Sequence, residues 1–241
     1  MNIAINRDCM EVMKEYPDGY FDLAVVDPPY GIGVQTMNFT KSGARKEGRN
    51  SKARRRDYRR TDEWDTRPTQ EYFDELFRVS KKQIIWGGNY FTDMIPPSKG
   101  FICWDKRIGD TTNDFADCEY AWMSKGLGVA RMFRFMWNGM LQGDMKNKEE
   151  RFHPTQKPVA LYAWIYDKFA ERGMKILDTH LGSGSSRLAA YDAGLDFVGC
   201  EIDKFYFDKE EERFANYIAQ ANLFTAGEEP AEQIGLLEGE T

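Results

Sequence analysis

The chain has 241 residues, of which 41% are hydrophobic, 14% are aromatic and 30% are charged, and its formal net charge is −6. This length and composition are those of a globular domain that buries a full sheet between helices, and no run approaches the roughly 18 apolar residues of a membrane span. Because the amino terminus also lacks a basic region followed by an apolar one, we expect no secretory signal and a soluble, cytoplasmic protein without a membrane partner.

The charge is distributed unevenly along the chain. Residues 41–60 contain ten lysines and arginines against two acidic residues, whereas residues 225–241 contain five glutamates and no basic residue. An acidic segment with few apolar residues cannot bury enough surface to fold, so we expect a disordered tail. The four cysteines form no C-x-x-C pair and only two histidines are present, which predicts reduced thiols and no metal site.

Predicted strands and helices alternate along the chain. Short β-branched apolar runs predict strands, and apolar residues at helical spacing predict helices. In chain order we predict a strand at 2–6, a helix at 9–15, a strand at 21–26, a helix at 69–80, strands at 83–86, 101–104, 118–123 and 131–137, a helix at 158–172, a strand at 174–177, a helix at 185–193, a strand at 197–200 and a helix at 205–221. This alternation implies a mostly parallel α/β sheet in one domain over residues 1–224.

The strand at 21–26 runs into Asp27-Pro28-Pro29-Tyr30. Two prolines stop the strand and hold the preceding residue in extended geometry, so the Asp27 carboxylate and the Pro28 carbonyl should stand rigidly beside the Tyr30 ring. Two acceptors beside a ring suit an aromatic amine, whose lone pair becomes available for attack when acceptors hold its N–H groups. Taken alone, the tetrapeptide is equally compatible with a simple turn.

A Gly-rich, polar stretch follows the tetrapeptide and predicts an inserted segment at about residues 31–67. The basic run falls inside it. It could be a solvated loop, but its position next to the tetrapeptide favours contact with the phosphates of a nucleic acid. The candidate residues are Arg45, Arg49, Arg54, Arg55, Arg56, Arg59 and Arg60.

A second unusual strand end lies at residues 178–186. Gly182 and Gly184 let the backbone approach a ligand closely, and the following helix offers free N–H groups to an anion. Arg187 replaces the third glycine of the dinucleotide-binding fingerprint, which argues against a nicotinamide cofactor. Glu201 follows the next strand, where it can accept hydrogen bonds from ribose hydroxyls. Such a loop is also compatible with a tight turn that binds nothing.

Together, Asp27-Pro28-Pro29-Tyr30, residues 153–158 (His-Pro-Thr-Gln-Lys-Pro) and residues 178–186 resemble three motifs of the DNA amino-methyltransferases. Their order matches the permuted class, in which the catalytic motif precedes the cofactor motif. The resemblance covers residues 1–35 and 150–220 well. It implies the S-adenosylmethionine-dependent methyltransferase fold, a doubly wound, seven-stranded, mostly parallel sheet.

The resemblance also implies roles for individual residues. Asp27 and the Pro28 carbonyl would hold the target amine, followed by Pro29, and Tyr30 would stack on a base flipped out of the duplex. Asp8 would contact the adenine of the cofactor, Glu201 its ribose, and Thr155 and Lys157 its carboxylate. The full set expected at the S-adenosylmethionine site is Asp8, Asp27, Thr155, Lys157, Asp178, Leu181, Gly182, Ser183, Gly184, Ser185 and Glu201.

The aspartate in the tetrapeptide favours adenine N6 as the target in double-stranded DNA, because the corresponding serine is commoner for cytosine N4. Cytosine-N4 methylation, RNA adenine methylation and an idle nucleic-acid-binding subunit remain alternatives. The resemblance leaves open a homodimer and a restriction partner. The chain departs from the family at Asp178-Thr179-His180, where the family usually has Asp-Pro-Phe, so His180 would replace an aromatic wall beside the cofactor. We expect His153 and His180 to pack loops instead of transferring protons.

Overall fold

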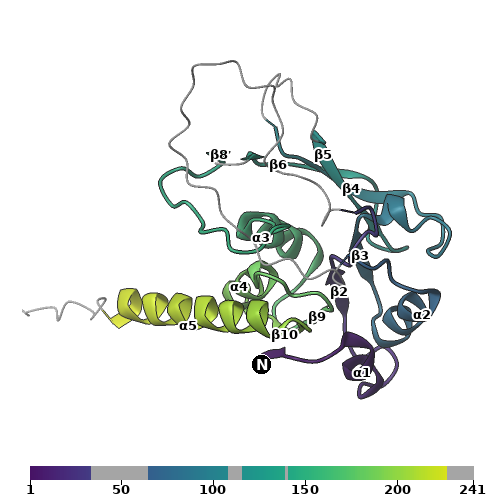
Figure 1. Cartoon of the computed structure of the whole chain (residues 1–241), viewed down its shortest axis with the longest axis horizontal. Coiled ribbons are helices and arrows are strands. Elements are labelled where there is room, and N and C mark those ends of the chain that lie inside the picture. The colour runs from purple at the N-terminus through teal and green to yellow at the C-terminus, as the bar shows by residue number, and fades with distance from the viewer. Residues whose placement is uncertain (34–64, 108–115, 139–140, 227–241) are drawn as a thin grey trace, which may run out of the picture.

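The computed structural model describes residues 1–33, 65–107, 116–138 and 141–226 (Figure 1). The predicted basic segment, with all seven candidate arginines, and the acidic tail therefore lie outside the described residues, apart from the ends at 31–33, 65–67 and 225–226. In chain order the elements are β1 (Asn2–Ile5), α1 (Cys9–Lys14), β2 (Leu23–Val26), α2 (Gln70–Val79), β3 (Gln83–Trp86), the 3-10 helix η2 (Gly88–Tyr90), β4 (Gly100–Asp105), β5 (Cys118–Met123), β6 (Arg131–Arg134), β7 (Trp137–Asn138), β8 (Leu141–Gln142), α3 (Val159–Phe169), β9 (Lys175–Asp178), α4 (Ser185–Asp192), β10 (Asp196–Cys200) and α5 (Lys204–Ala226).

The main sheet has the strand order β1-β10-β9-β2-β3-β5-β4-β6. The first five strands in this order are parallel, β5 is antiparallel to both β3 and β4, and β6 is parallel to β4. The predicted mostly parallel α/β sheet is thus confirmed. Within the described residues the sheet has eight strands, one for each strand predicted along the chain and one more than the seven that the resemblance implies. The first four residues of the predicted strand at 131–137 pair with the outer edge of β4, while Trp137 begins a separate β7–β8 hairpin.

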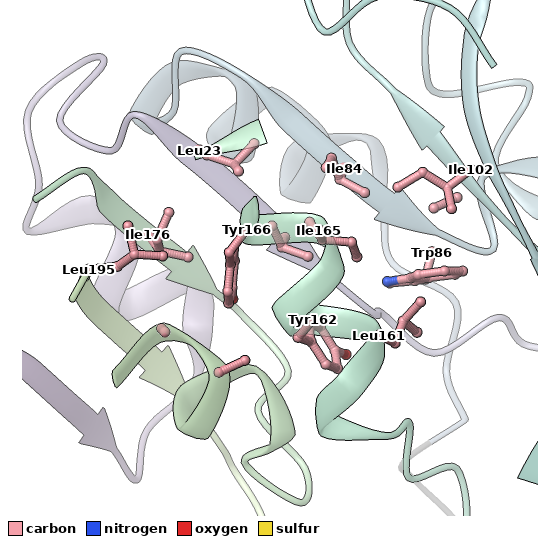
Figure 2. Packing of buried hydrophobic residues seen from close by; sticks show 14 of the residues in the cluster. Leu23, Ile84, Trp86, Ile102, Leu161, Tyr162, Ile165, Tyr166, Ile176 and Leu195 are labelled. Carbon is pink, nitrogen blue, oxygen red and sulfur yellow. The ribbon is translucent and has the colours of Figure 1, made fainter. Parts of the chain in front are cut away.

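Helices cover both faces of the parallel strands. On one face α3 and α4 pack on alternate strand residues such as Val25, Ile84 and Ile176, and Figure 2 shows the α3 side chains directed at this face. On the other face α1 and α2 pack on the intervening residues, such as Val26 and Ile85. Both sides of each central strand are therefore buried, which explains why β2 and β3 are fully buried runs without polar alternation.

The topology brings the ends of distant segments to one edge of the sheet. The carboxyl ends of β1, β10, β9, β2 and β3 meet there because these strands are parallel. Since β5 is antiparallel to β3, the beginning of β5 lies at the same edge, and so does the end of β4. Residues following β1, β2, β3, β4, β9 and β10, together with the first residues of β5, are thereby gathered around one site.

None of the helices in the described parts of the chain combines the length and the apolarity that crossing a membrane would require. The longest, α5, runs along α4 and ends far from the sheet (Figure 1). It continues to Ala226, so the first two residues of the predicted acidic tail belong to a helix.

Candidate active site

The tetrapeptide after β2 is held by its own side chains and by η2. The Tyr30 hydroxyl donates to Asp27 Oδ1 over 2.7 Å. Burial, together with the neighbouring Asp27, raises the pKa of Tyr30 well above its ordinary value, so the hydroxyl stays protonated and remains a donor. The Tyr30 ring stacks on Tyr90, with centroids 4.9 Å apart and an angle of 20° between the planes. An aromatic platform therefore stands next to the Asp27 carboxylate.

Gly87, the residue after β3, lies against the Tyr30 ring. Its φ is +68°, and a Cβ at this position would lie 2.2 Å from Tyr30 Cε1. Both the backbone conformation and the close approach therefore require glycine. The end of β3 thus sets the position of the tyrosine that ends the tetrapeptide.

We expect Gly87→Ala to lower the free energy of unfolding by about 2 kcal/mol or more, through the left-handed backbone cost and the displacement of Tyr30. Gly173→Ala is the matched control, because Gly173 has φ +84° and a Cβ there meets nothing within 4 Å. Urea unfolding of both variants measures the difference. Equal losses would mean that the contact with Tyr30 contributes nothing.

A chain of alternating charges reaches Asp27 from the sheet. The Lys157 ammonium donates to Asp27 Oδ2 and lies 3.4 Å from Glu119 Oε2. Lys106 donates to Glu119 Oε1 over 2.8 Å. Lys157 is only 5% exposed. Burial works against its charge, but Asp27 and Glu119 outweigh burial, so the pKa of Lys157 is raised and the ammonium stays charged.

The loop after β9 is built around Asp178, which is buried. Its carboxylate accepts hydrogen bonds from the His180 backbone N–H over 3.1 Å and from the Ser186 hydroxyl. Burial raises the pKa of Asp178 to about 7, although these two donors oppose the shift and the charges of Asp27 and Glu201 add to it. The carboxylate is therefore held by neutral donors in a place that disfavours its charge.

Glu201, directly after β10, ties this loop to the neighbouring strand. Its Oε2 accepts the Gly182 N–H over 2.8 Å and its Oε1 accepts the Asp203 N–H over 2.8 Å. The Leu181 N–H donates to the Cys200 carbonyl over 2.8 Å. Burial raises the pKa of Glu201, and its backbone donors oppose this shift. Each carboxylate oxygen keeps a further lone pair for a ligand.

The remainder of the loop is fixed from α5. Gly184 has φ +73°, and a Cβ there would lie 2.4 Å from Glu210 Cγ. Arg213 donates to the Ser183 carbonyl over 2.8 Å and to the Ser185 hydroxyl over 3.0 Å. The Gly-rich loop is therefore a rigid turn whose path only glycine permits at Gly184.

A cavity opens beside this loop. Two carboxylates in its wall, Asp8 and Glu201, offer acceptors, and Asp8 also caps α1 by accepting the Met10 N–H over 2.7 Å. His180 lies edge-on to Tyr72, with ring centroids 5.5 Å apart, and burial lowers the pKa of His180 to about 4, so the ring is neutral. The cavity is lined by Arg7, Asp8, Cys9, Thr179, His180, Cys200, Glu201 and Ile202.

The side chains of residues 153–158 contact two different parts of the site, the Gly-rich loop and the tetrapeptide. The His153 ring packs on Tyr206 beside Gly182, and its Nδ1 lies 3.2 Å from the Thr155 hydroxyl. Burial lowers the pKa of His153 to about 4. Lys157, in contrast, extends to Asp27 and Glu119. The structure thus places Thr155 near the Gly-rich loop, whereas the Lys157 ammonium contacts the tetrapeptide.

Sequence reasoning missed the residues that support the tetrapeptide from β3, β4 and β5, among them Tyr90, Lys106 and Glu119. The one available signal was Gly87-Gly88, a glycine pair directly after a buried strand. The charged partners carried no signal, because Glu119 meets Lys157 only through the antiparallel direction of β5, and Lys106 is linked to Lys157 only through Glu119.

Known proteins resemble this chain over most of its length. A family model described as DNA methylase matches residues 46–212. The putative methylase YubD of Escherichia coli K12 is 25% identical over 227 residues, which cover 89% of this chain and 91% of YubD. The solved M1.HpyAVI–SAM complex is 20% identical with a TM-score of 0.53, over 88% of this chain and 100% of that chain. The PvuII DNA methyltransferase (cytosine-N4-specific) is 12% identical with a TM-score of 0.57, over 95% and 94%. At these identities the solved structures show a shared fold.

Proposed function

The chain belongs to the N6/N4 DNA methylase family, and we propose that it transfers the methyl group of S-adenosylmethionine to the N6 amino group of adenine in double-stranded DNA. One observation carries this proposal. β2 and β9 are adjacent parallel strands, so the tetrapeptide with its acceptors and the Gly-rich loop with its cavity open at the same edge of the sheet. An amine-binding group and a cofactor-binding group therefore lie side by side.

The cavity residues fit S-adenosylmethionine. Asp8 and Glu201 offer acceptors to the amino and hydroxyl groups of its nucleoside, and the rigid turn at Gly182 and Gly184 admits close backbone approach. The buried Asp178 and the partly buried Glu201 are carboxylates held by neutral donors, so a cationic ligand brought near them is electrostatically favoured. When bound, this cofactor supplies a methyl group on a positively charged sulfur.

The other residues predicted at the cofactor are Thr155, Lys157, Leu181, Ser183 and Ser185, with Asp27 at the boundary to the target amine. Thr155 lies beside His153 at the Gly-rich loop. Leu181, Ser183 and Ser185 fix the loop through the hydrogen bonds described above. We propose that Thr155, Leu181, Ser183 and Ser185 shape the pocket for the methionine part of the ligand, whereas the Lys157 ammonium contacts Asp27 and Glu119.

The tetrapeptide performs the chemistry on the target. Asp27 and the Pro28 carbonyl accept hydrogen bonds from the two N–H groups of the adenine amine, which localises the nitrogen lone pair for attack. The Tyr30 ring stacks on the flipped base, as it stacks on Tyr90 in this structure. The amine gains a methyl group and must lose one proton, and the Asp27 carboxylate is placed to accept it.

The choice of adenine over cytosine rests on the aspartate of the tetrapeptide. Cytosine N4 is the second candidate, because the cytosine-N4-specific PvuII enzyme shares the fold with a TM-score of 0.57. The same two acceptors would serve the amine of either base.

We further propose that residues 1–224 form one methyltransferase domain and that the inserted segment at about 31–67 reads the target sequence, with its arginines on the phosphates. Asp65 accepts the Gly31 N–H over 3.0 Å, so the segment leaves and rejoins the domain right beside Tyr30. Association as a homodimer, or with a restriction partner, fits the family and stays a prediction.

The test is to incubate the protein with duplex DNA and, in a parallel reaction, with RNA, each with S-adenosylmethionine that carries a labelled methyl group, and then to digest the nucleic acid and identify the labelled nucleoside. We expect N6-methyladenine. Labelled N4-methylcytosine would reject adenine and keep the enzyme class. Label in RNA alone would reject the DNA substrate, and label in neither would favour a nucleic-acid-binding subunit without activity.

A further inference from the structure

Lys157 is a buried cation with a function that its sequence motif does not explain. Its ammonium contacts Asp27 Oδ2 and Glu119 Oε2, lies 3.5 Å from the Tyr30 hydroxyl oxygen, and sits 5.3 Å above the Trp86 ring. A buried ammonium is costly to desolvate unless it is paired on several sides. These contacts supply that pairing, and all of them face the tetrapeptide and the sheet edge.

Both oxygens of Asp27 are held by different donors. Tyr30 donates to Oδ1 and Lys157 to Oδ2. Two donors on opposite oxygens fix the plane of a carboxylate, which a single donor cannot do. The lone pairs that remain on Asp27 therefore point in defined directions, and these directions determine where an amine can be held.

Glu119 holds Lys157 in this position. It lies in β5, whose antiparallel direction brings its first residues to the edge where β2 ends. Its Oε2 attracts Lys157, while its Oε1 accepts from Lys106, which follows β4. Lys157 and Lys106 outweigh the effect of burial, so the pKa of Glu119 is lowered and it stays ionised. Glu119 thus anchors the lysine to the framework of the sheet.

We propose that Lys157 and Glu119 are positioning residues for Asp27: Lys157 orients the Asp27 carboxylate as an acceptor for the target amine, and Glu119 keeps Lys157 in place. This inference rests on the proposed function of Asp27. It differs from the role that the sequence motif implies for Lys157, which is to flank the carboxylate of the cofactor. The two roles predict different effects of the same substitutions.

The experiment compares Lys157→Met, Glu119→Ala and the conservative Glu119→Gln with Lys168→Met, an exposed lysine on α3 that contacts Asp167. For Lys157→Met we expect kcat to fall about 100-fold, because a misplaced reacting group costs about that much. KM for DNA should change far less than kcat, because the lost contact orients the reacting group and does not itself bind the substrate. The dissociation constant for S-adenosylmethionine, measured by calorimetry, should change by less than about three-fold.

Glu119→Ala should lower kcat about ten-fold with little change in KM, because Lys157 is no longer anchored. Glu119→Gln keeps one acceptor oxygen in place of two, so it can hold only one of the two lysines and should restore part of the activity. Lys168→Met should leave all values unchanged. Glu119→Ala also keeps the test valid if Lys157→Met, which leaves two carboxylates without their shared lysine, fails to fold.

A second readout needs no turnover. The carboxyl carbon of Asp27, labelled with carbon-13, reports its surroundings by NMR, and we expect its chemical shift at a fixed pH to change in Lys157→Met and Glu119→Ala but not in Lys168→Met. An unchanged chemical shift would overturn the inference even if the wild-type protein proved inactive, an outcome that would separately reject the proposed function. Loss of S-adenosylmethionine binding with kcat intact would assign Lys157 to the cofactor instead. Lower thermal stability with an unchanged kcat would make the network merely structural.

Discussion

Asp27→Asn is expected to lower the rate of methyl transfer by about 10³-fold or more while the fold is kept. Asparagine has the shape of aspartate, but it presents one acceptor where the carboxylate presents two. Its amide N–H groups would also face the donor groups of Tyr30 or Lys157, which now bind Asp27. The target amine would lose its acceptor, and the site would lose the group that can take the departing proton.

The measurement is single-turnover transfer of labelled methyl to DNA, with S-adenosylmethionine binding and thermal unfolding recorded for the same protein. Asp27→Ala is less informative, because it leaves the buried Lys157 without one of its two carboxylates. Asp167→Asn, on the exposed side of α3, is the control. A rate for Asp27→Asn within about ten-fold of wild type would contradict the role of Asp27 as the acceptor that activates the amine.

Asp178→Asn is expected to stabilise the ligand-free protein at high pH and to weaken its binding of S-adenosylmethionine. The pKa of Asp178 rises from an ordinary value of 3.8 to about 7 in the folded chain, so folding favours the neutral carboxyl. The stability from this group is fully present below about pH 4 and is lost as the pH rises through 7. Above pH 7 the buried charge costs on the order of 4 kcal/mol, which a neutral amide avoids.

Urea unfolding at pH 5 and pH 8 tests this sign. At pH 8 the variant should exceed the wild type by a few kcal/mol, and at pH 5 most of this difference should disappear. Binding of S-adenosylmethionine should weaken about ten-fold or more, because the carboxylate that favours a cation is gone. The Asp178 carboxylate would then favour ligand binding while it lowers the stability of the ligand-free protein, a combination often found at active sites. An equal gain at both pH values would show that the raised pKa does not explain the effect.

The sequence was sufficient to predict the class of fold and the residues at its strand ends. β3 and β5 begin and end where the sequence predicts, at 83–86 and 118–123, because β3 is a buried run with two isoleucines and a tryptophan and β5 carries two aromatic residues, both types that favour strands. The tetrapeptide and the Gly-rich loop were expected together because parallel strands share one carboxyl edge. The tetrapeptide and the Gly-rich loop lie about 150 residues apart in the sequence. The shared direction of their parallel strands was enough to predict that they meet.

The charged residues that hold Lys157 could not be predicted from the sequence, because their contact depends on an antiparallel pair of strands. Glu119 meets Lys157 only because β5 runs antiparallel to β3, and six residues of a strand do not encode the direction of its neighbours. Lys157 was expected beside the carboxylate of the cofactor because the family resemblance assigns it there, but its ammonium contacts Asp27 and Glu119. Because the lysine side chain is long and flexible, the position of its backbone does not determine where its ammonium group lies.

Arg187, whose presence argues against the dinucleotide-binding fingerprint, has a structural role in this fold. It stands where dinucleotide-binding proteins have a third glycine, and in this structure it is buried. Its guanidinium donates to both carboxylate oxygens of Glu210, over 3.0 and 2.9 Å, and lies 3.8 Å from the centre of the Phe214 ring. The residue that breaks the fingerprint therefore attaches α4 to α5. Neither partner could be recognised from spacing, because α5 reads as a uniformly charged helix.

The hydrogen bond between Gly31 and Asp65 joins the two ends of the inserted segment beside the tetrapeptide. The backbone N–H of one end meets the carboxylate of the other over 3.0 Å, and Arg67 is held in turn by the Tyr90 carbonyl over 2.8 Å. The stretch between these ends can be exchanged for one of another length at little entropic cost, since closure entropy grows only slowly with length. Under our proposal that this segment reads the target sequence, chimeras that carry the corresponding segment of a relative are expected to methylate a different DNA sequence while the residues at the strand ends stay unchanged.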